Sequence, residues 1–240
     1  MKNFRKTGLL VAILVIPVFI FMFLKSCGEN HYQLPTFIPL VDSTTGGVLL
    51  KKNNNPHFDE LEFDTVYHSV PDFDLIDQNG AVFKSKQALQ NSIYVANFFF
   101  TRCGSICPKM STQLTRVQDN FTSFPDVKLI SISVDPEFDS VDELRKYAKD
   151  YDAVKGKWYF LRGEKKLVYP LAVKGFFIPV ADASEYDKAI RNPDETFIHS
   201  EKLVLVDKQN HIRGFYDGTD KADVDRLMLE IKVLQATYKE

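Results

Sequence analysis

The sequence has no excess of either charge and few side chains that bind soft metals. Its 240 residues carry 30 Lys and Arg against 32 Asp and Glu, which gives a formal net charge of -2 and a pI near 6.2. Proteins that bind nucleic acid need a basic excess for the phosphates, so no nucleic-acid partner is expected. Among three cysteines and five histidines, no CxxC or HxxxH pair occurs. A structural zinc site with four ligands is therefore not expected.

An apolar N-terminus precedes the rest of the chain. Sixteen apolar residues run without interruption from Leu9 to Leu24, after three basic residues. This is close to the roughly 20 residues that span a bilayer, and the basic residues should keep the N-terminus in the cytoplasm. Alternatively, Leu24-Lys25-Ser26-Cys27 resembles a bacterial lipoprotein box that would lipidate Cys27, although Lys25 fits it poorly. Residues 1–27 are predicted to be a membrane anchor or a lipoprotein signal, with the remaining chain on the extracytoplasmic side.

The remainder divides into a lead-in and one domain. Residues 28–60 are rich in Pro, Gly and Asn, so we predict a linker with little regular structure. Residues 61–240 alternate between strand and helix patterns, which predicts an α/β sandwich with a mixed central sheet flanked by helices. The expected elements are a hairpin around Asn79-Gly80, a buried strand at 93–100, a helix from near Pro108, a strand at 127–134, a helix capped by Ser140 and Glu143, a strand at 158–161, a hairpin of 202–207 with 212–216, and a last helix carrying Val224 to Leu234.

Two cysteines fall in the predicted turn from the buried strand into the next helix. Cys107 precedes Pro108, so it should avoid the helical conformation while Pro108 takes the first helical position. The free N–H groups and the dipole at that helix N-terminus favour a thiolate. Cys103 is close enough in sequence for a disulfide, but such a short loop gives a disulfide little stabilising effect. The pair is therefore capable of both redox chemistry and metal binding.

Two thiolates completed by one imidazole would suit Cu(I), which is soft and accepts few ligands. His199 precedes a predicted strand of the same sheet and is the first candidate, and His68 is the second. An ordinary surface or core histidine remains the alternative for both. The other three histidines lie in the lead-in or in a predicted hairpin turn.

The segment from Phe98 to Pro108 resembles the CxxxCP motif of the Sco (SenC-type) copper chaperones, members of the thioredoxin superfamily. Residues 133–139 are similar to the SVDP segment of that family, with its two acids four apart. His199-Ser200, followed by an apolar strand and Gly214, resembles the segment that carries the family's copper histidine. The resemblance covers roughly residues 66–237. One departure is Gly104, where many members have proline; we expect it to loosen the turn and shift its redox potential while every ligand stays in place.

The resemblance implies a thioredoxin-like sandwich that binds copper through Cys103, Cys107 and His199, as Cu(I) and in many members also as Cu(II). The implied recipient is the binuclear copper centre of cytochrome c oxidase subunit II. We expect the turn that holds the cysteines to be exposed, so that copper can be handed on. Asp135 and Asp139 would tune the site or dock the partner; the alternative is an Asp-Pro turn with solvated acids near a helix start. We favour the alternative for Asp139 and the functional role for Asp135.

A second hypothesis is a thiol–disulfide oxidoreductase that reduces partner cysteines without carrying metal. One of Cys103 and Cys107 would attack as a thiolate and the other would resolve the mixed disulfide. Such reductants usually have CxxC and do not need His199. A peroxidase would place Thr and Arg around its cysteine, whereas Thr101 and Arg102 precede the pair. A binding module with a lost active site has little support because every motif residue is present.

Overall fold

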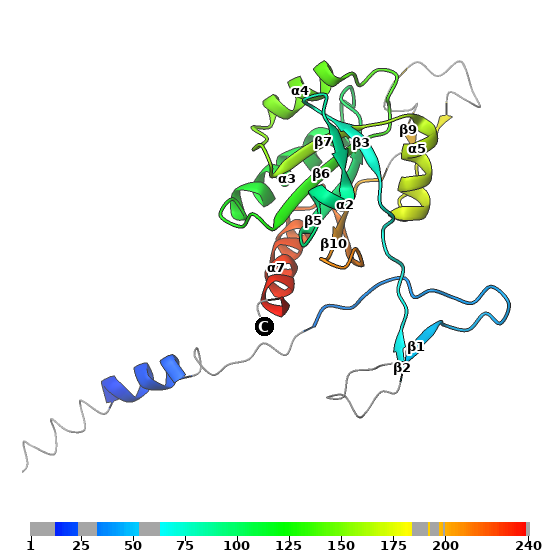
Figure 1. The fold of residues 1–240 in the computed structure, drawn as a ribbon. Coiled ribbons are helices and arrows are strands. Elements are labelled where there is room, and N and C mark those ends of the chain that lie inside the picture. Colours follow the sequence, from blue (N-terminus) through cyan, green and yellow to red (C-terminus); the bar gives the residue numbers. More distant parts are fainter. Residues whose placement is uncertain are drawn as a thin grey trace, which may run out of the picture.

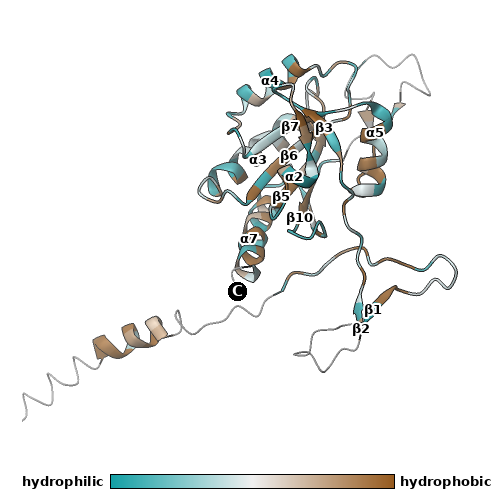
Figure 2. Cartoon of the chain, in the orientation of Figure 1, coloured by the Kyte–Doolittle hydropathy of each residue, from teal (hydrophilic) through white to brown (hydrophobic). Residues whose placement is uncertain are grey.

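The computed structural model describes residues 13–23, 33–52, 63–183, 192, 197–198 and 200–238. Two predicted functional residues, Cys27 and His199, lie outside the described residues. Residues 13–23 are helical with exposed apolar side chains, and Figure 2 shows this helix as hydrophobic throughout. In the part of the chain that the structure describes, no helix combines the length and apolar character needed to cross a membrane.

A seven-stranded mixed sheet forms the centre of the domain (Figure 1). The interior strand β5 (Ile93–Phe99) is buried at all seven positions, as expected for a continuous apolar run that is covered on both faces. β5 pairs in parallel with β6 (Val127–Ser133), and β6 pairs in parallel with β7 (Trp158–Arg162). The strand order is β11-β10-β5-β6-β7-β3-β4. The predicted fold class is confirmed.

Both predicted hairpins are present, and they form the two edges of this sheet. β3 (Asp74–Asp77) pairs with β4 (Val82–Lys84) through a turn in which Gly80 has φ +82°. β10 (Lys202–Val206) pairs with β11 (Ile212–Asp217) and is antiparallel to β5. A positive φ is easily adopted by glycine, which explains why the Asn-Gly pair predicts the first turn.

Three long helices cover one face of the sheet, and a shorter helical segment covers the other (Figure 1). Adjacent strand residues point to opposite faces, so Phe99 packs on Tyr147 of α4 while Phe98 packs on Phe176 beyond η1. The short α2 (Ser85–Ala88) follows β4. The other helices are α3 (Ile106–Asn120), α4 (Val141–Asp150), α7 (Lys221–Thr237), α5 (Lys165–Pro170) and the π-helical η1 (Leu171–Gly175).

Two observations differ from the sequence predictions. α3 begins at Ile106, so Cys107 and Pro108 are both inside its first turn. Proline is tolerated there because the N–H groups of a first turn have no acceptor within the helix. The lead-in is also more regular than expected, since β1 (Leu50–Lys52) pairs with β2 (Phe63–Thr65).

The lead-in is fastened to the edge strand β11. Arg213 donates from Nε to the carbonyl of Pro35 at 2.9 Å and also hydrogen-bonds the carbonyl of Leu34, while its Nη1 pairs with buried Asp207 at 2.8 Å. The N–H of Phe37 donates to the carbonyl of Ile212 at 3.0 Å. These contacts cover the edge of the sheet, which would otherwise present unpaired backbone groups.

Candidate functional site

The candidate site lies where β5 ends and α3 begins. The backbone N–H of Cys107 donates to Sγ of Cys103 at 3.3 Å, and both residues are thiols in the structure. The geometry follows from the helix start, because the N–H groups of a first turn point out of the helix toward the preceding loop. The sulfur that receives the helix N–H is thus the first cysteine of the motif, whereas the sequence pattern assigned this role to Cys107.

Both sulfurs lie beneath the turn and not on its surface. Cys103 is 4% exposed and Cys107 is 0% exposed, whereas Arg102, Gly104 and Ser105 between strand and helix are exposed. The turn is thus exposed, as expected, but both cysteines within it are buried in this conformation. Solvent therefore has little access to either sulfur, although the turn residues on both sides of Cys103 are exposed.

The carboxylate of Asp139 hydrogen-bonds the chain just after the end of β5. It accepts the backbone N–H of Thr101, at 3.2 Å to each oxygen, and the hydroxyl groups of Thr101 and Ser133. The side chain is fully buried, so the interpretation of Asp139 as a solvated acid is wrong. Burial raises the pKa of this carboxyl above its ordinary value of 3.8, although the hydroxyl hydrogen bonds act in the opposite direction. Asp139 thus connects Thr101, two residues after the end of β5, to Ser133, the last residue of β6, directly before the cysteine turn.

Asp135 holds the next residue of the same turn. Nε of Arg102 donates to its carboxylate at 2.7 Å, and the Asp135 side chain is 4% exposed against 36% for Arg102. The guanidinium also lies 4.8 Å from the ring centroid of Phe138 and 5.9 Å from that of Phe197. Neither Thr101 nor Arg102 is assigned this role by the sequence pattern. Their positions directly before Cys103 were the available indication.

A pair of hydroxyls lies on the helix side of the cysteines. Oγ of Ser111 in α3 and the phenol oxygen of Tyr147 in α4 are 3.0 Å apart in a buried position. Burial raises the pKa of the Tyr147 phenol, and a charge on Cys107 acts in the same direction. Tyr147 therefore stays protonated as a hydrogen-bonding group beside the thiols.

The segment that contains the predicted histidine approaches the same end of the sheet. β10 runs antiparallel to β5 with Val204 opposite Ala96, so the start of β10 lies beside the end of β5. Phe197, in the short strand β9 (Phe197–Ile198) paired with β8 (Ala181–Asp182), has its ring centroid 4.9 Å from that of Phe100. Phe197, two residues before His199, thus packs on Phe100, three residues before Cys103.

His68, the second candidate, is engaged elsewhere. Its Nε2 lies 2.9 Å from the carbonyl oxygen of Gly175, and its ring packs edge-on against Phe177 with centroids 4.8 Å apart. Within the described ranges, no three His, Cys, Asp or Glu side chains are grouped closely enough to hold a metal ion. His68 therefore does not complete a site with the two cysteines.

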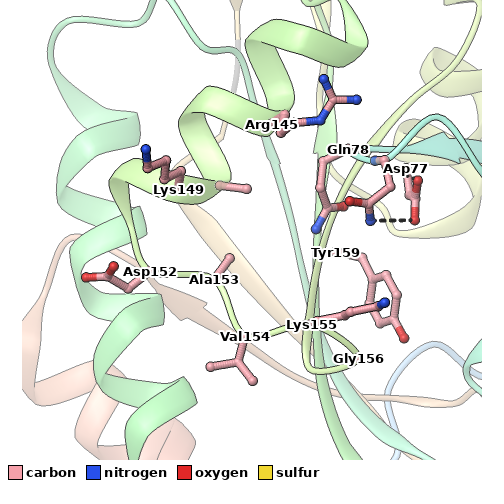
Figure 3. Close-up of a pocket in the computed structure, with 12 residues that line it drawn as sticks. Asp77, Gln78, Arg145, Lys149, Asp152, Ala153, Val154, Lys155, Gly156 and Tyr159 are labelled. Carbon is pink, nitrogen blue, oxygen red and sulfur yellow. Dashed lines mark hydrogen bonds between the residues drawn. The ribbon is translucent and has the colours of Figure 1, made fainter.

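A separate cleft of about 550 Å³ lies between α4, the turn after it and the β3–β7 side of the sheet (Figure 3). Gln78 on its wall is committed to the sheet, since its side chain accepts the N–H of Phe160 at 3.0 Å and donates to the carbonyl of Trp158 at 3.2 Å. Arg145 and Lys149 extend from α4 on the other side. Neither cysteine lines this cleft, so it is not part of the candidate site.

Comparison with known proteins gives one family. The SCO1/SenC family model matches residues 64–234. The "SCO1 protein homolog" of Bacillus subtilis is 29% identical over 171 residues, covering 70% of this chain and 84% of the relative.

Two solved structures share the fold. BsSco, described as a member of the Sco family of cytochrome c oxidase assembly proteins with a disulfide switch, has a TM-score of 0.59 and 26% identity, covering 72% of this chain and 95% of its own. ScoI of Bradyrhizobium japonicum with copper bound has a TM-score of 0.57 and 20% identity, covering 69% and 99%. The family match runs from within β2 to within α7 and includes both cysteines and both acids described above, so the chain belongs to the SCO1/SenC family.

Proposed function

We propose that this protein is a membrane-tethered, extracytoplasmic copper carrier that binds copper through Cys103, Cys107 and His199. It would deliver the metal to the binuclear copper centre of cytochrome c oxidase subunit II. The observation that carries the proposal is the cysteine pair in one turn, with the Cys107 N–H directed at Sγ of Cys103. Two thiolates from one turn form a soft, low-coordinate donor set, which suits Cu(I) and, with an imidazole, also Cu(II).

His199 is proposed as the third ligand on the basis of chain connectivity. Phe197 packs on Phe100, and two Cα–Cα steps span at most about 7 Å. This short connection supports the choice of His199 as the ligand that joins the turn carrying Cys103. The copper-bound ScoI relative supports the choice of metal, and the description of BsSco as an oxidase assembly protein supports the choice of recipient.

Copper stoichiometry tests the three-ligand site. The full chain is purified in detergent, its thiols are reduced, Cu(I) is added, and bound copper is measured after desalting for the parent, His199→Ala and His211→Ala. We expect one copper per chain in the parent and in His211→Ala, and a large loss of affinity in His199→Ala. A parent that keeps no copper, or a His199→Ala variant with unchanged affinity and spectrum, contradicts the proposal.

A second function is favoured by the same hydrogen bond. A backbone N–H directed at Sγ of Cys103 stabilises a thiolate there, which is what a thiol–disulfide oxidoreductase needs for attack on a partner disulfide. Both cysteines would then become a disulfide as the partner's two sulfurs are reduced to thiols. In this case Cys103→Ser abolishes reduction of a model disulfide while His199→Ala retains it. The opposite dependence on His199 separates the copper carrier from the reductase.

The tether is proposed from the apolar run and its basic flank. Residues 1–27 would anchor the chain, residues 28–60 would link it, and residues 61–240 would form the extracytoplasmic domain. Labelling with a radioactive fatty acid separates the two kinds of anchor. If Cys27 is lipidated, Cys27→Ala abolishes the label and weakens membrane retention; if the run is an uncleaved helix, the variant stays in the membrane fraction unchanged.

A further inference from the structure

Half of the exposed large apolar residues outside the 13–23 helix lie in one short part of the lead-in. We call this part the arm; it comprises residues 37–52 and 63–65. Seven of the fourteen such residues in the described chain belong to the arm. Among them, Val41, Val48, Leu50 and Phe63 are each about half exposed, at 54, 47, 57 and 48%. Exposed apolar clusters of this kind mark surfaces that contact a membrane or another protein.

The arm is a β-ribbon held together by its own backbone hydrogen bonds. The N–H of Leu49 donates to the carbonyl of Leu40 and the N–H of Val66 to that of Leu49, at 2.8 and 2.9 Å. Asp42 closes the turn between residues 41 and 48 by accepting the N–H groups of Thr44 and Thr45. A ribbon this narrow cannot bury its own apolar side chains, because it has no second layer to pack against. Figure 1 shows it projecting away from the helices that cover the central sheet.

The sequence position of the arm points to what covers it. The helical apolar segment ends at Phe23 and the described lead-in resumes at Gln33. Phe37, where the arm starts, is fourteen residues after Phe23, and a chain of this length spans at most about 50 Å, so the arm is the first described element that the apolar segment can bring to a membrane surface. Lys51 and Lys52 in β1 are exposed, and Asp42 and Asp64 within the arm balance their charge. A narrow apolar ribbon without net charge fits the interface of a bilayer, where headgroups meet acyl chains.

We infer that the arm lies on the outer surface of the bilayer and fixes the orientation of the domain on it. This inference rests on the proposed tether, and it adds a second membrane contact within the folded part of the chain. The ribbon stays at the headgroup level, where its unpaired backbone groups still reach water. The covering partner in this inference is lipid, and a second copy of this chain is the alternative that the test below distinguishes.

The orientation has a consequence for the cysteines. The arm joins the sheet next to the turn after β10, since the N–H of Val70 donates to the carbonyl of Asn210. This turn lies at the start of β5, because Val206 is opposite Tyr94. Cys103 follows the other end of β5. With the arm on the bilayer, the cysteine pair faces away from the membrane, toward the extramembrane part of a recipient protein.

Tryptophan quenching by brominated lipids tests the contact. The full chain is reconstituted in vesicles of phosphatidylcholine and phosphatidylglycerol, with and without bromine on the acyl chains. Leu50→Trp is compared with Leu167→Trp in α5, a leucine with similar exposure, 57 against 52%, that lies outside the arm. The single native tryptophan, Trp158, is fully buried and gives a common background. Phe63→Trp reports on the second strand of the arm and serves if Leu50→Trp folds poorly.

We expect bromolipid to quench the added emission of Leu50→Trp and Phe63→Trp, and to leave Leu167→Trp at the level of the parent. If the chain floats with vesicles but all three variants match the parent, the arm is not on the lipid while the tether stands. If the arm tryptophans are shielded from an aqueous quencher, are unaffected by bromolipid, and the chain is dimeric in detergent, a second copy covers the arm and the inference is overturned. A chain that does not float with vesicles removes the tether and with it the inference, whereas copper stoichiometry in detergent tests the metal site independently.

Discussion

The backbone N–H of Cys107 donates a hydrogen bond to Sγ of Cys103 at 3.3 Å, which makes the two sulfurs of the motif unequal. The N–H belongs to the first turn of α3, where the helix dipole adds partial positive charge. Cys103 also has slightly more access to solvent than Cys107, at 4% against 0% exposed.

We predict that Cys103 reacts faster with iodoacetamide at neutral pH than Cys107. The expected ratio is about tenfold, since a hydrogen bond to a charged group stabilises it by about 1.5–3 kcal/mol. The measurement compares alkylation rates of Cys107→Ser, which retains Cys103, and Cys103→Ser, which retains Cys107, each with Cys27→Ala to remove background. Equal rates, or a faster Cys107, would show that the hydrogen bond does not control thiolate formation.

The ion pair between Arg102 and Asp135 predicts an unequal cost for removing its two partners. Arg102→Ala leaves a carboxylate that is 4% exposed without its cation, whereas Asp135→Asn leaves a guanidinium that is 36% exposed and can turn to water. Breaking a buried pair by removing one partner costs about 3–5 kcal/mol, and we expect Arg102→Ala to approach this range and Asp135→Asn to fall well below it. Urea unfolding of both variants and of the double variant measures the difference. A larger cost for Asp135→Asn contradicts the assignment.

Asp139 predicts a pH-dependent contribution to stability. Burial raises its pKa in the folded state above 3.8, so the folded chain holds a proton that the unfolded chain has released. The stabilisation from this group is present below pH 3.8 and is lost as pH rises through the folded-state pKa. Relative to Asp139→Asn, the parent should therefore lose stability between acidic and neutral pH, as measured by urea unfolding at each pH. A gap that widens in favour of the parent with rising pH would show that the carboxylate is stabilised in its charged form.

Truncation of the same residue tests its structural role. Asp139→Ala leaves the Thr101 N–H and two hydroxyls without an acceptor, and each unsatisfied buried group costs about 1–3 kcal/mol. Asp139→Asn keeps one acceptor oxygen and should cost less than Asp139→Ala at every pH. Because Thr101 precedes Cys103 by two residues, Asp139→Ala should also speed alkylation of the cysteines by loosening the turn. Unchanged alkylation in a folded Asp139→Ala variant would separate the acid from the position of the thiols.

Local sequence patterns predicted those elements well whose conformation depends on neighbouring residues alone. The continuous apolar run of β5, the Asn79-Gly80 turn and the Ser140 cap all have short-range causes, and in the structure Oγ of Ser140 accepts the N–H of Glu143 at 3.2 Å. The family resemblance was likewise carried by short motifs at the right separation, and the family match confirms it.

Long-range contacts explain what the sequence did not predict. The burial of Asp139 depends on Thr101 and Ser133 at the ends of two neighbouring strands, which no local pattern reveals. The same holds for the burial of the two cysteines and for the hydrogen bonds that Arg213 donates to the carbonyls of Leu34 and Pro35. Pro108 was predicted to take the first helical position, but α3 begins two residues earlier, at Ile106. A proline fits several positions of a first turn, and the pattern alone does not choose among them.

Gly214 gives a prediction for the scaffold, because it lies in β11 opposite Leu205, near the end of β10. A Cβ at this position would lie 2.3 Å from the phenol oxygen and 2.6 Å from Cζ of Tyr216, a fully buried side chain whose hydroxyl donates to Glu230. Gly214→Ala forces that ring to move within a packed core, so we expect it to cost about 1–3 kcal/mol in urea unfolding. Gly47→Ala is the matched control, because its Cβ would have one ordinary contact, 3.5 Å from the Thr45 hydroxyl. If the clash is the cause, Tyr216→Phe combined with Gly214→Ala should recover part of the loss, since phenylalanine lacks the hydroxyl oxygen, which is the nearest atom. A simple sum of the two single costs would place the origin elsewhere.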